Sequence, residues 1–150
     1  MYSAILVSHI AISILLIFLV LYIVIRSFLG ILGRVSFSRF LDVQLSILAV
    51  VFLYLELILG ILLYAIYINK LETFITQVNA NTYFSARFWA AEHAILMFFA
   101  IIFGHLGLVY AKNLSEDKQK FQKNLLYFGL SFVLIFISIT MNMLLSLIHI

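Results

Sequence analysis

The sequence predicts an all-α integral membrane protein, a bundle of four transmembrane helices. Hydrophobic residues make up 66% of its 150 residues, where a soluble protein has about 45–50%. Charged residues make up only 10%, against about 25% in soluble domains, and so few charges cannot cover a soluble globule. Four stretches are long and continuously apolar, whereas a membrane β-barrel would alternate apolar and polar residues.

The four predicted helices cover roughly residues 4–25, 41–67, 84–110 and 124–148, and the chain forms one domain, 1–150. No basic residue precedes the first span and Arg26 follows it, so this span is expected to remain as a helix rather than to be cleaved as a signal. Ser115, just before two acidic residues, is typical of an N-cap from which the fourth helix would begin early.

Basic residues predict the orientation. Seven lie on the face shared by the loop between the first two helices and the loop between the last two: Arg26, Arg34, Arg39, Lys112, Lys118, Lys120 and Lys123. Only Lys70 and Arg87 lie on the other face. Because basic residues concentrate on the cytoplasmic side, both termini are expected outside, which is the periplasm for a bacterial inner membrane. The net charge of +3 forms no basic patch, so no nucleic-acid partner is expected.

The outer loop, about residues 68–83, has a helical pattern of its own. Leu71, Phe74, Ile75 and Val78 repeat at i, i+3, i+4 and i+7, with polar residues between them. The pattern fits a short amphipathic helix on the outer membrane surface and, equally, an ordered loop packed on the bundle.

Ionisable side chains inside spans are costly and usually face the bundle interior, so they are candidates for function. Six qualify: His9, Asp42, Glu56, Glu92, His93 and His105. Asp42 lies near the inner surface and close to Arg39, which predicts a surface ion pair. Glu56 fits a neutral carboxyl group bonded in the core, a partner for a histidine, or part of a proton path. His105 is about 120° around the helix from His93, so the two are not expected to share a site.

His9 and His93 are the strongest candidates. By helix rise His9 lies about 8–9 Å and His93 about 13 Å from the outer surface. Two histidines at similar depth on different helices would ligate a b-type haem inside a bundle. Ser13 lies one turn from His9, Asn142 lies near the level of the histidines, and Arg87 at the outer mouth would pair with a haem propionate.

Two observations leave alternatives open. His93, Met97, Ala100, Gly104 and Gly107 share one face of the third helix, and small residues admit either a flat macrocycle or a neighbouring helix. The histidines would also be satisfied without metal by Ser, Asn or Glu from other helices. No cysteine, phosphate-binding loop, zinc-protease motif or transporter repeat points to another chemistry.

Several blocks of the chain resemble a family. They are Met1-Tyr2-Ser3-Ala4 followed by His9, Gly60-Ile-Leu-Leu-Tyr64, Arg87-Phe-Trp-Ala-Ala-Glu92-His93 with Met97, Lys120-Phe121, and Tyr127-Phe128-Gly129-Leu130. Over nearly its whole length the chain resembles small four-helix bacterial membrane proteins labelled cytochrome b-like. The resemblance implies that His9 and His93 are family positions. It also implies a further histidine at the place of Tyr54, which this chain lacks.

The leading expectation is a membrane-bound haem b protein that passes electrons, with the haem between His9 and His93. Its partners would be the lipid bilayer and a quinone, a periplasmic carrier or a larger respiratory complex. The alternative is a cofactor-free accessory subunit of such a complex. A proton or small-solute conduit through Glu56 ranks last.

Overall fold

A computed structural model describes residues 2–74 and 91–148 of the chain, without the side chains of 67–74 and 142–148. Its four long helices are α1 (Tyr2–Ile31), α2 (Arg39–Phe74), α4 (His93–Asn113) and α5 (Asp117–Ile148). Each is long and apolar enough to cross a membrane, and the described residues contain no strand. The predicted all-α, four-helix membrane architecture is confirmed.

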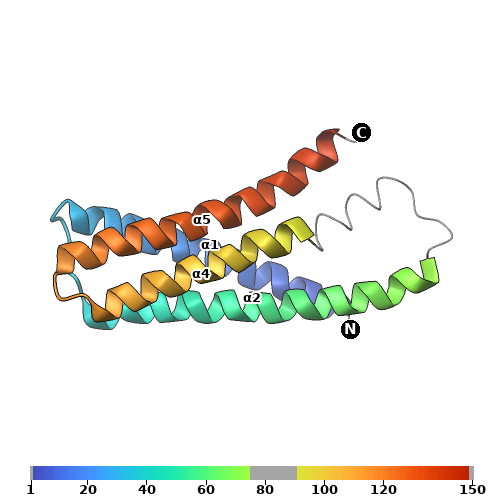
Figure 1. The fold of residues 1–150 in the computed structure, drawn as a ribbon, viewed down its shortest axis with the longest axis horizontal. Coiled ribbons are helices and arrows are strands. Elements are labelled where there is room, and N and C mark those ends of the chain that lie inside the picture. Colours follow the sequence, from blue (N-terminus) through green and yellow to red (C-terminus); the bar gives the residue numbers. More distant parts are fainter. Residues whose placement is uncertain (1, 75–90, 149–150) are drawn as a thin grey trace.

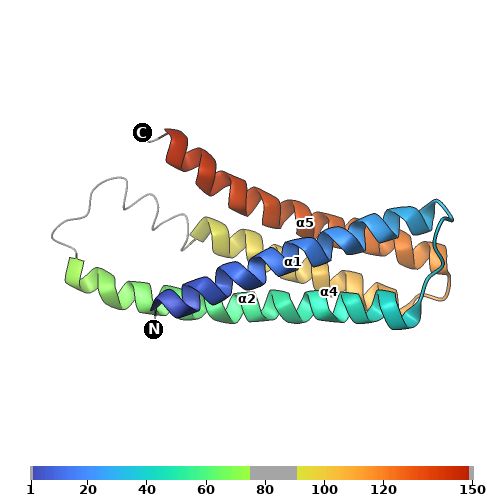
Figure 2. The same cartoon turned by 180° about the vertical axis from the view of Figure 1, so that it is seen from behind.

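The helices run alternately up and down, and each packs against two others (Figure 1). α5 contacts both α4 and α1, so the order α1, α2, α4, α5 closes into a four-sided bundle, with α1 and α4 on one diagonal. The connections 32–38 and 114–116 lie at the same end, called here the basic end. The chain termini lie toward the opposite end, called the terminal end, where α5 diverges from α2 (Figure 2).

The helices extend beyond the apolar runs that predicted them. α1 continues past residue 25 to Ile31, α2 continues past 67 to Phe74, and α5 begins at Asp117 rather than 124. Hydropathy marks the part of a helix that lies in hydrocarbon, whereas the helix continues until its backbone is stopped. The predicted third span is described from residue 91 onward, and its first part, 84–90, lies outside the described residues. Of the predicted amphipathic segment 68–83, the part up to Phe74 continues α2, and the rest is also outside them.

A glycine ends α1. Gly33 has φ +71°, the left-handed conformation that glycine adopts without steric cost. Its N–H bonds the Gly30 carbonyl at 3.0 Å, and the Arg34 N–H bonds the Leu29 carbonyl at 3.0 Å. These two bonds form a Schellman motif, which satisfies carbonyls at the helix end and turns the chain toward α2.

The start of α5 corrects the predicted cap by one residue. The Glu116 carbonyl accepts the Lys120 N–H at 3.0 Å, and the carbonyl of an N-cap residue accepts the first bond of its helix. Glu116 therefore holds the cap position that Ser115 was expected to hold. The early start of the fourth helix is confirmed.

The predicted surface pair of Asp42 with Arg39 is wrong. Asp42 is buried, and its carboxylate instead receives two hydrogen bonds from Arg26 of α1, from Nε at 2.5 Å and from Nη2 at 3.1 Å. The same carboxylate accepts the Ser38 N–H at 2.7 Å, while Ser38 Oγ accepts the Leu41 N–H at 3.2 Å. The ion pair and the N-terminus of α2 thus form one cluster that ties α1 to α2. Arg39 is nearer to Asp42 in sequence, but the chain turns back between α1 and α2 and places Arg26 against Asp42.

The close-packed core occupies only part of the bundle. Among described side chains, the last fully buried residue of each helix toward the terminal end is Leu16 in α1, Glu56 in α2, Ala100 in α4 and Ser138 in α5. From this level to the basic end the helices bury a continuous apolar cluster. Toward the terminal end every described side chain is at least partly exposed.

The small residues of α4 serve helix packing. A Cβ added at Gly104 would lie 2.6 Å from Leu53 Cδ1 of α2, and one at Gly107 would lie 2.7 Å from Phe128 Cε2 of α5. Side chains of two neighbouring helices therefore fill the space over these glycines. The small residues of α4 were expected to admit either a flat macrocycle or a neighbouring helix. At Gly104 and Gly107 the structure shows a neighbouring helix.

Candidate functional site

The structure brings His9 and His93 together. Their ring centroids are 6.3 Å apart and their planes meet at 72°. His9 comes from α1 and His93 from α4, so the contact spans a diagonal of the bundle. Both rings lie just beyond the close-packed core, on the side of the terminal end, and both are only partly exposed.

Glu56 of α2 contacts His9 of α1. Its Oε2 lies 2.6 Å from His9 Nδ1 and accepts a hydrogen bond of 2.9 Å from Ser13 Oγ. The contact with His9 is close, but the oxygen lies off the direction of the ring N–H, so the two form a poorly aligned polar contact. The Glu56 side chain is only 4% exposed, and its Oε1 has no hydrogen-bond partner among the described residues.

Ser138 of α5 holds His93 in a similar way. His93 Nδ1 and Ser138 Oγ are 2.6 Å apart, and either atom can donate the hydrogen. Ser138 is 1% exposed, so its position is fixed by packing. One residue from each helix therefore joins a polar chain across the bundle, from Glu56 through His9 and His93 to Ser138.

The donor set limits the kinds of metal that fit. Among the described residues, no group of three or more His, Cys, Asp or Glu side chains could hold a metal ion. Structural zinc needs four protein ligands and catalytic zinc three. Haem iron needs at most two axial ligands, because the macrocycle supplies the rest. Metal–imidazole bonds are about 2.0–2.1 Å long, so two rings on opposite sides of one metal have centroids roughly 6 Å apart. The histidine pair has that spacing, and the residues present fit haem.

Of the other predicted site residues, the structure places only Ser13 in the site. Ser13 lies in the site, bonded to Glu56 rather than to either histidine. Asn142 lies in α5 one turn beyond Ser138, but its side chain is not described, and Arg87 lies outside the described residues. His105 does not join the pair, as its helical position predicted, and instead contacts Tyr54.

Glu56 and Ser138 were missing from the predicted site. Glu56 was considered as a histidine partner, but one sequence does not show which of three histidines it would meet. Ser138 was not among the predicted site residues. The signal in the sequence was that Ser138 lies seven residues after Ser131, on the same face of α5. Ser131 is also buried, and its hydroxyl donates to the Ala100 carbonyl of α4 at 3.0 Å, so this face of α5 is directed at α4.

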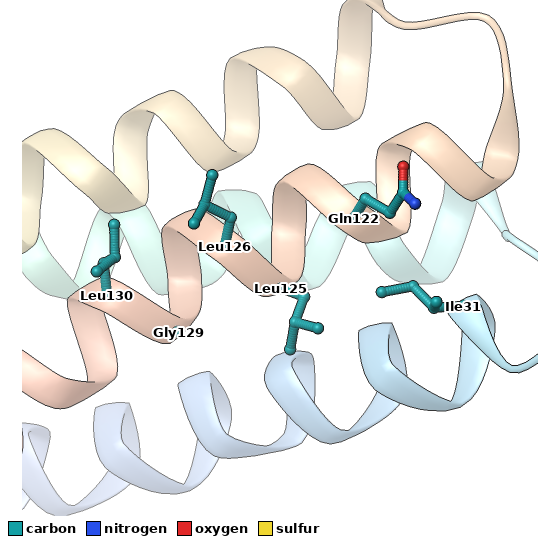
Figure 3. A pocket seen from close by; sticks show the side chains of 6 residues that line it. All are labelled: Ile31, Gln122, Leu125, Leu126, Gly129 and Leu130. Carbon is teal, nitrogen blue, oxygen red and sulfur yellow. The ribbon is translucent and has the colours of Figure 1, made fainter.

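A hollow elsewhere in the bundle is unrelated to this site. It lies near the basic end, has a volume of about 440 Å³, and is lined by Ile31 of α1 and by Gln122, Leu125, Leu126, Gly129 and Leu130 of α5 (Figure 3). Its lining is apolar apart from Gln122, so it offers no set of metal ligands or acid–base groups.

Comparison with known proteins identifies no relative. No protein-family model, curated protein or solved structure matches the chain.

Proposed function

We propose that the protein is a membrane-bound b-type haem protein that passes electrons, with the haem held between His9 and His93. The observation that carries the proposal is the 6.3 Å separation of the two imidazole centroids across the α1–α4 diagonal. This spacing accompanies a lack of any third metal ligand in the described part of the chain, as expected where a macrocycle supplies the remaining bonds.

The packing of the bundle supports the same proposal. The close-packed core ends at Glu56 and Ser138, and the histidines lie on its open side. A macrocycle there would not have to displace the core, whose glycines are already covered by Leu53 and Phe128. Held by His9 and His93, a b-type haem would supply a one-electron redox couple.

The neighbouring side chains have positioning roles. Glu56 contacts His9 through Nδ1 and Ser138 contacts His93 through Nδ1, so Nε2 is the nitrogen of each ring that would bind iron. A hydrogen-bonding partner fixes the orientation and tautomer of a ligating histidine. Ser138 is such a partner for His93, whereas Glu56 places its carboxylate against Nδ1 of His9. Ser13 in turn fixes the Glu56 carboxylate, which limits the freedom of His9.

The test is an optical difference spectrum, reduced minus oxidised, of protein purified from haem-replete cells. Wild type should show sharp bands of low-spin b-type haem. His9→Ala and His93→Ala should each lose them, because each removes one axial ligand. His105→Ala is the matched control, since it removes a histidine of the same bundle outside the site and should leave the bands intact.

Two results would overturn the proposal: a colourless wild-type protein, or bands that survive both substitutions. A colourless protein that co-purifies with a larger membrane complex would instead identify a cofactor-free accessory subunit. In that case the histidine pair, Glu56 and Ser138 would be a polar packing network.

The proposal extends to topology and partners. The seven basic residues at the basic end support an orientation with this end in the cytoplasm and both termini in the periplasm of a bacterial inner membrane. The haem would then lie in the periplasmic half and exchange electrons with a quinone, a periplasmic carrier or a respiratory complex. Alkaline phosphatase fused to the C-terminus should be active, and the same enzyme fused at residue 35 should be inactive. The opposite result would show that the protein has the reverse orientation.

A further inference from the structure

A histidine and a tyrosine lie on the lipid-facing surface of the bundle, outside the proposed haem site. His105 of α4 is exposed, and Tyr54 of α2 is 42% exposed. Their ring centroids are 6.4 Å apart, with the planes at 79°. The two helices therefore present one imidazole and one phenol side by side.

The pair lies deep in the membrane. Tyr54 is twelve residues along α2 from Asp42, which lies at the basic end, and the ring contact places His105 at a similar level. Twelve residues correspond to about 18 Å of helix, against a hydrocarbon thickness of about 30 Å. Both side chains therefore lie in the apolar interior of the membrane, at a similar depth.

The surrounding surface is apolar. Large exposed side chains flank the pair on both helices: Ile58 and Ile61 on α2, and Ile102 and Val109 on α4. These residues with Tyr54 and His105 are called here the α2/α4 face. Within the described part of the chain, the ring contact is the only interaction of either His105 or Tyr54. Lipid tails offer no hydrogen bonds, so polar groups left there without partners are costly.

We propose that the α2/α4 face is the interface with a second copy of this chain. A neutral imidazole has one hydrogen-bond donor and one acceptor, and a phenol has both, so the pair is complementary to itself. A two-fold axis along the membrane normal keeps both copies in the same orientation. Because His105 and Tyr54 lie at a similar depth, this axis allows His105 of each copy to meet Tyr54 of the other, as in an isologous dimer. Polar contacts of this kind between helices stabilise association in membranes.

Thiol-specific cross-linking tests the geometry, and the chain has no cysteine of its own. Tyr54→Cys in one copy and His105→Cys in the other should be joined efficiently by a short bis-maleimide in lipid membranes, because a contact between two long side chains leaves their Cα atoms too far apart for a direct disulfide but within reach of a spacer. The matched control pairs Tyr54→Cys with Phe18→Cys, since Phe18 of α1 is also lipid-facing, at 66% exposure. An equal yield in the control would overturn the proposal.

Association of variants without cysteine gives an independent test. Wild type in vesicles should be dimeric by single-molecule photobleaching over a range of protein-to-lipid ratios. Tyr54→Phe and His105→Leu should each weaken the dimer roughly tenfold or more, because each removes a polar contact twice. Helicity measured by circular dichroism checks that both variants fold. A wild-type protein that remains monomeric at every ratio refutes the interface, whatever the haem spectrum shows.

Discussion

Substitution of Gly107 by alanine separates the two uses of the small-residue face of α4. A Cβ at this position would lie 2.7 and 2.8 Å from two ring carbons of Phe128, and Phe128 is fully buried in the core. The ring cannot move aside without disturbing α4–α5 packing. The substitution therefore forces an extra methyl group into a full space.

The size of the effect follows from two opposing contributions. Overpacking of a core costs about 1–3 kcal/mol, while replacing glycine by alanine inside a helix stabilises it by about 0.5–1 kcal/mol. Gly129→Ala in α5 provides the matched control, because a Cβ there meets nothing within 4 Å. It isolates the second contribution, so Gly107→Ala should be less stable than Gly129→Ala by about 1–3 kcal/mol.

Unfolding by SDS in mixed micelles, followed by circular dichroism, measures this difference. Gly107 lies fourteen residues from His93, or about 21 Å along the helix, so the proposed haem spectrum should not change. Equal stability of the two alanine variants would refute the close approach of α4 and α5. Loss of the haem bands in Gly107→Ala alone, without loss of stability, would show that this face contacts the cofactor.

Three further predictions concern the ends of the bundle and the site. Arg26→Leu should destabilise the protein by about 3–5 kcal/mol, because it leaves the buried Asp42 carboxylate without its partner, and Asp42→Leu should cost less, because Arg26 is only partly buried; the double variant should regain most of the Arg26→Leu loss in the same SDS titration. Glu56→Ala should lower haem affinity by about 10–100-fold in a titration of haem-free protein, and Ser13→Ala by less. Gly33→Ala should cost about 1–2 kcal/mol, because alanine is strained at positive φ.

Each of these has a contrary result. If the double variant lost the sum of the two single losses, Arg26 and Asp42 would act independently. Unchanged haem affinity in Glu56→Ala would show that this carboxyl group does not position His9. Full stability of Gly33→Ala would mean that α1 ends without the left-handed turn.

Much of the fold was predictable because one physical signal dominates it. A run of about 20 apolar residues specifies a membrane helix, and four such runs predicted α1, α2, α4 and α5. Their ends were less predictable, since hydropathy does not report where a backbone stops. The extension of α1 to Ile31 depends on the turn at Gly33, which is a matter of local geometry rather than of hydrophobicity.

Sequence reasoning missed most of the side-chain contacts between helices, although not the one between the two histidines. Depth counting placed His9 and His93 at similar levels, and the structure brings their rings together. The partners Glu56 and Ser138 depend on which helix faces which, and a single sequence does not contain that information. Asp42 shows the same limit, because a basic residue three positions away was an obvious partner and the true one, Arg26, lies sixteen residues earlier.

The end of the close-packed core at one level has a mechanical consequence. The bundle is stiff where its two short connections and its buried side chains lie, and beyond that base the described parts of the helices are packed less closely. Moving a loosely packed helix end requires less free energy than opening a close-packed interior. Small movements of the helix ends around the two imidazoles therefore leave the folded base intact.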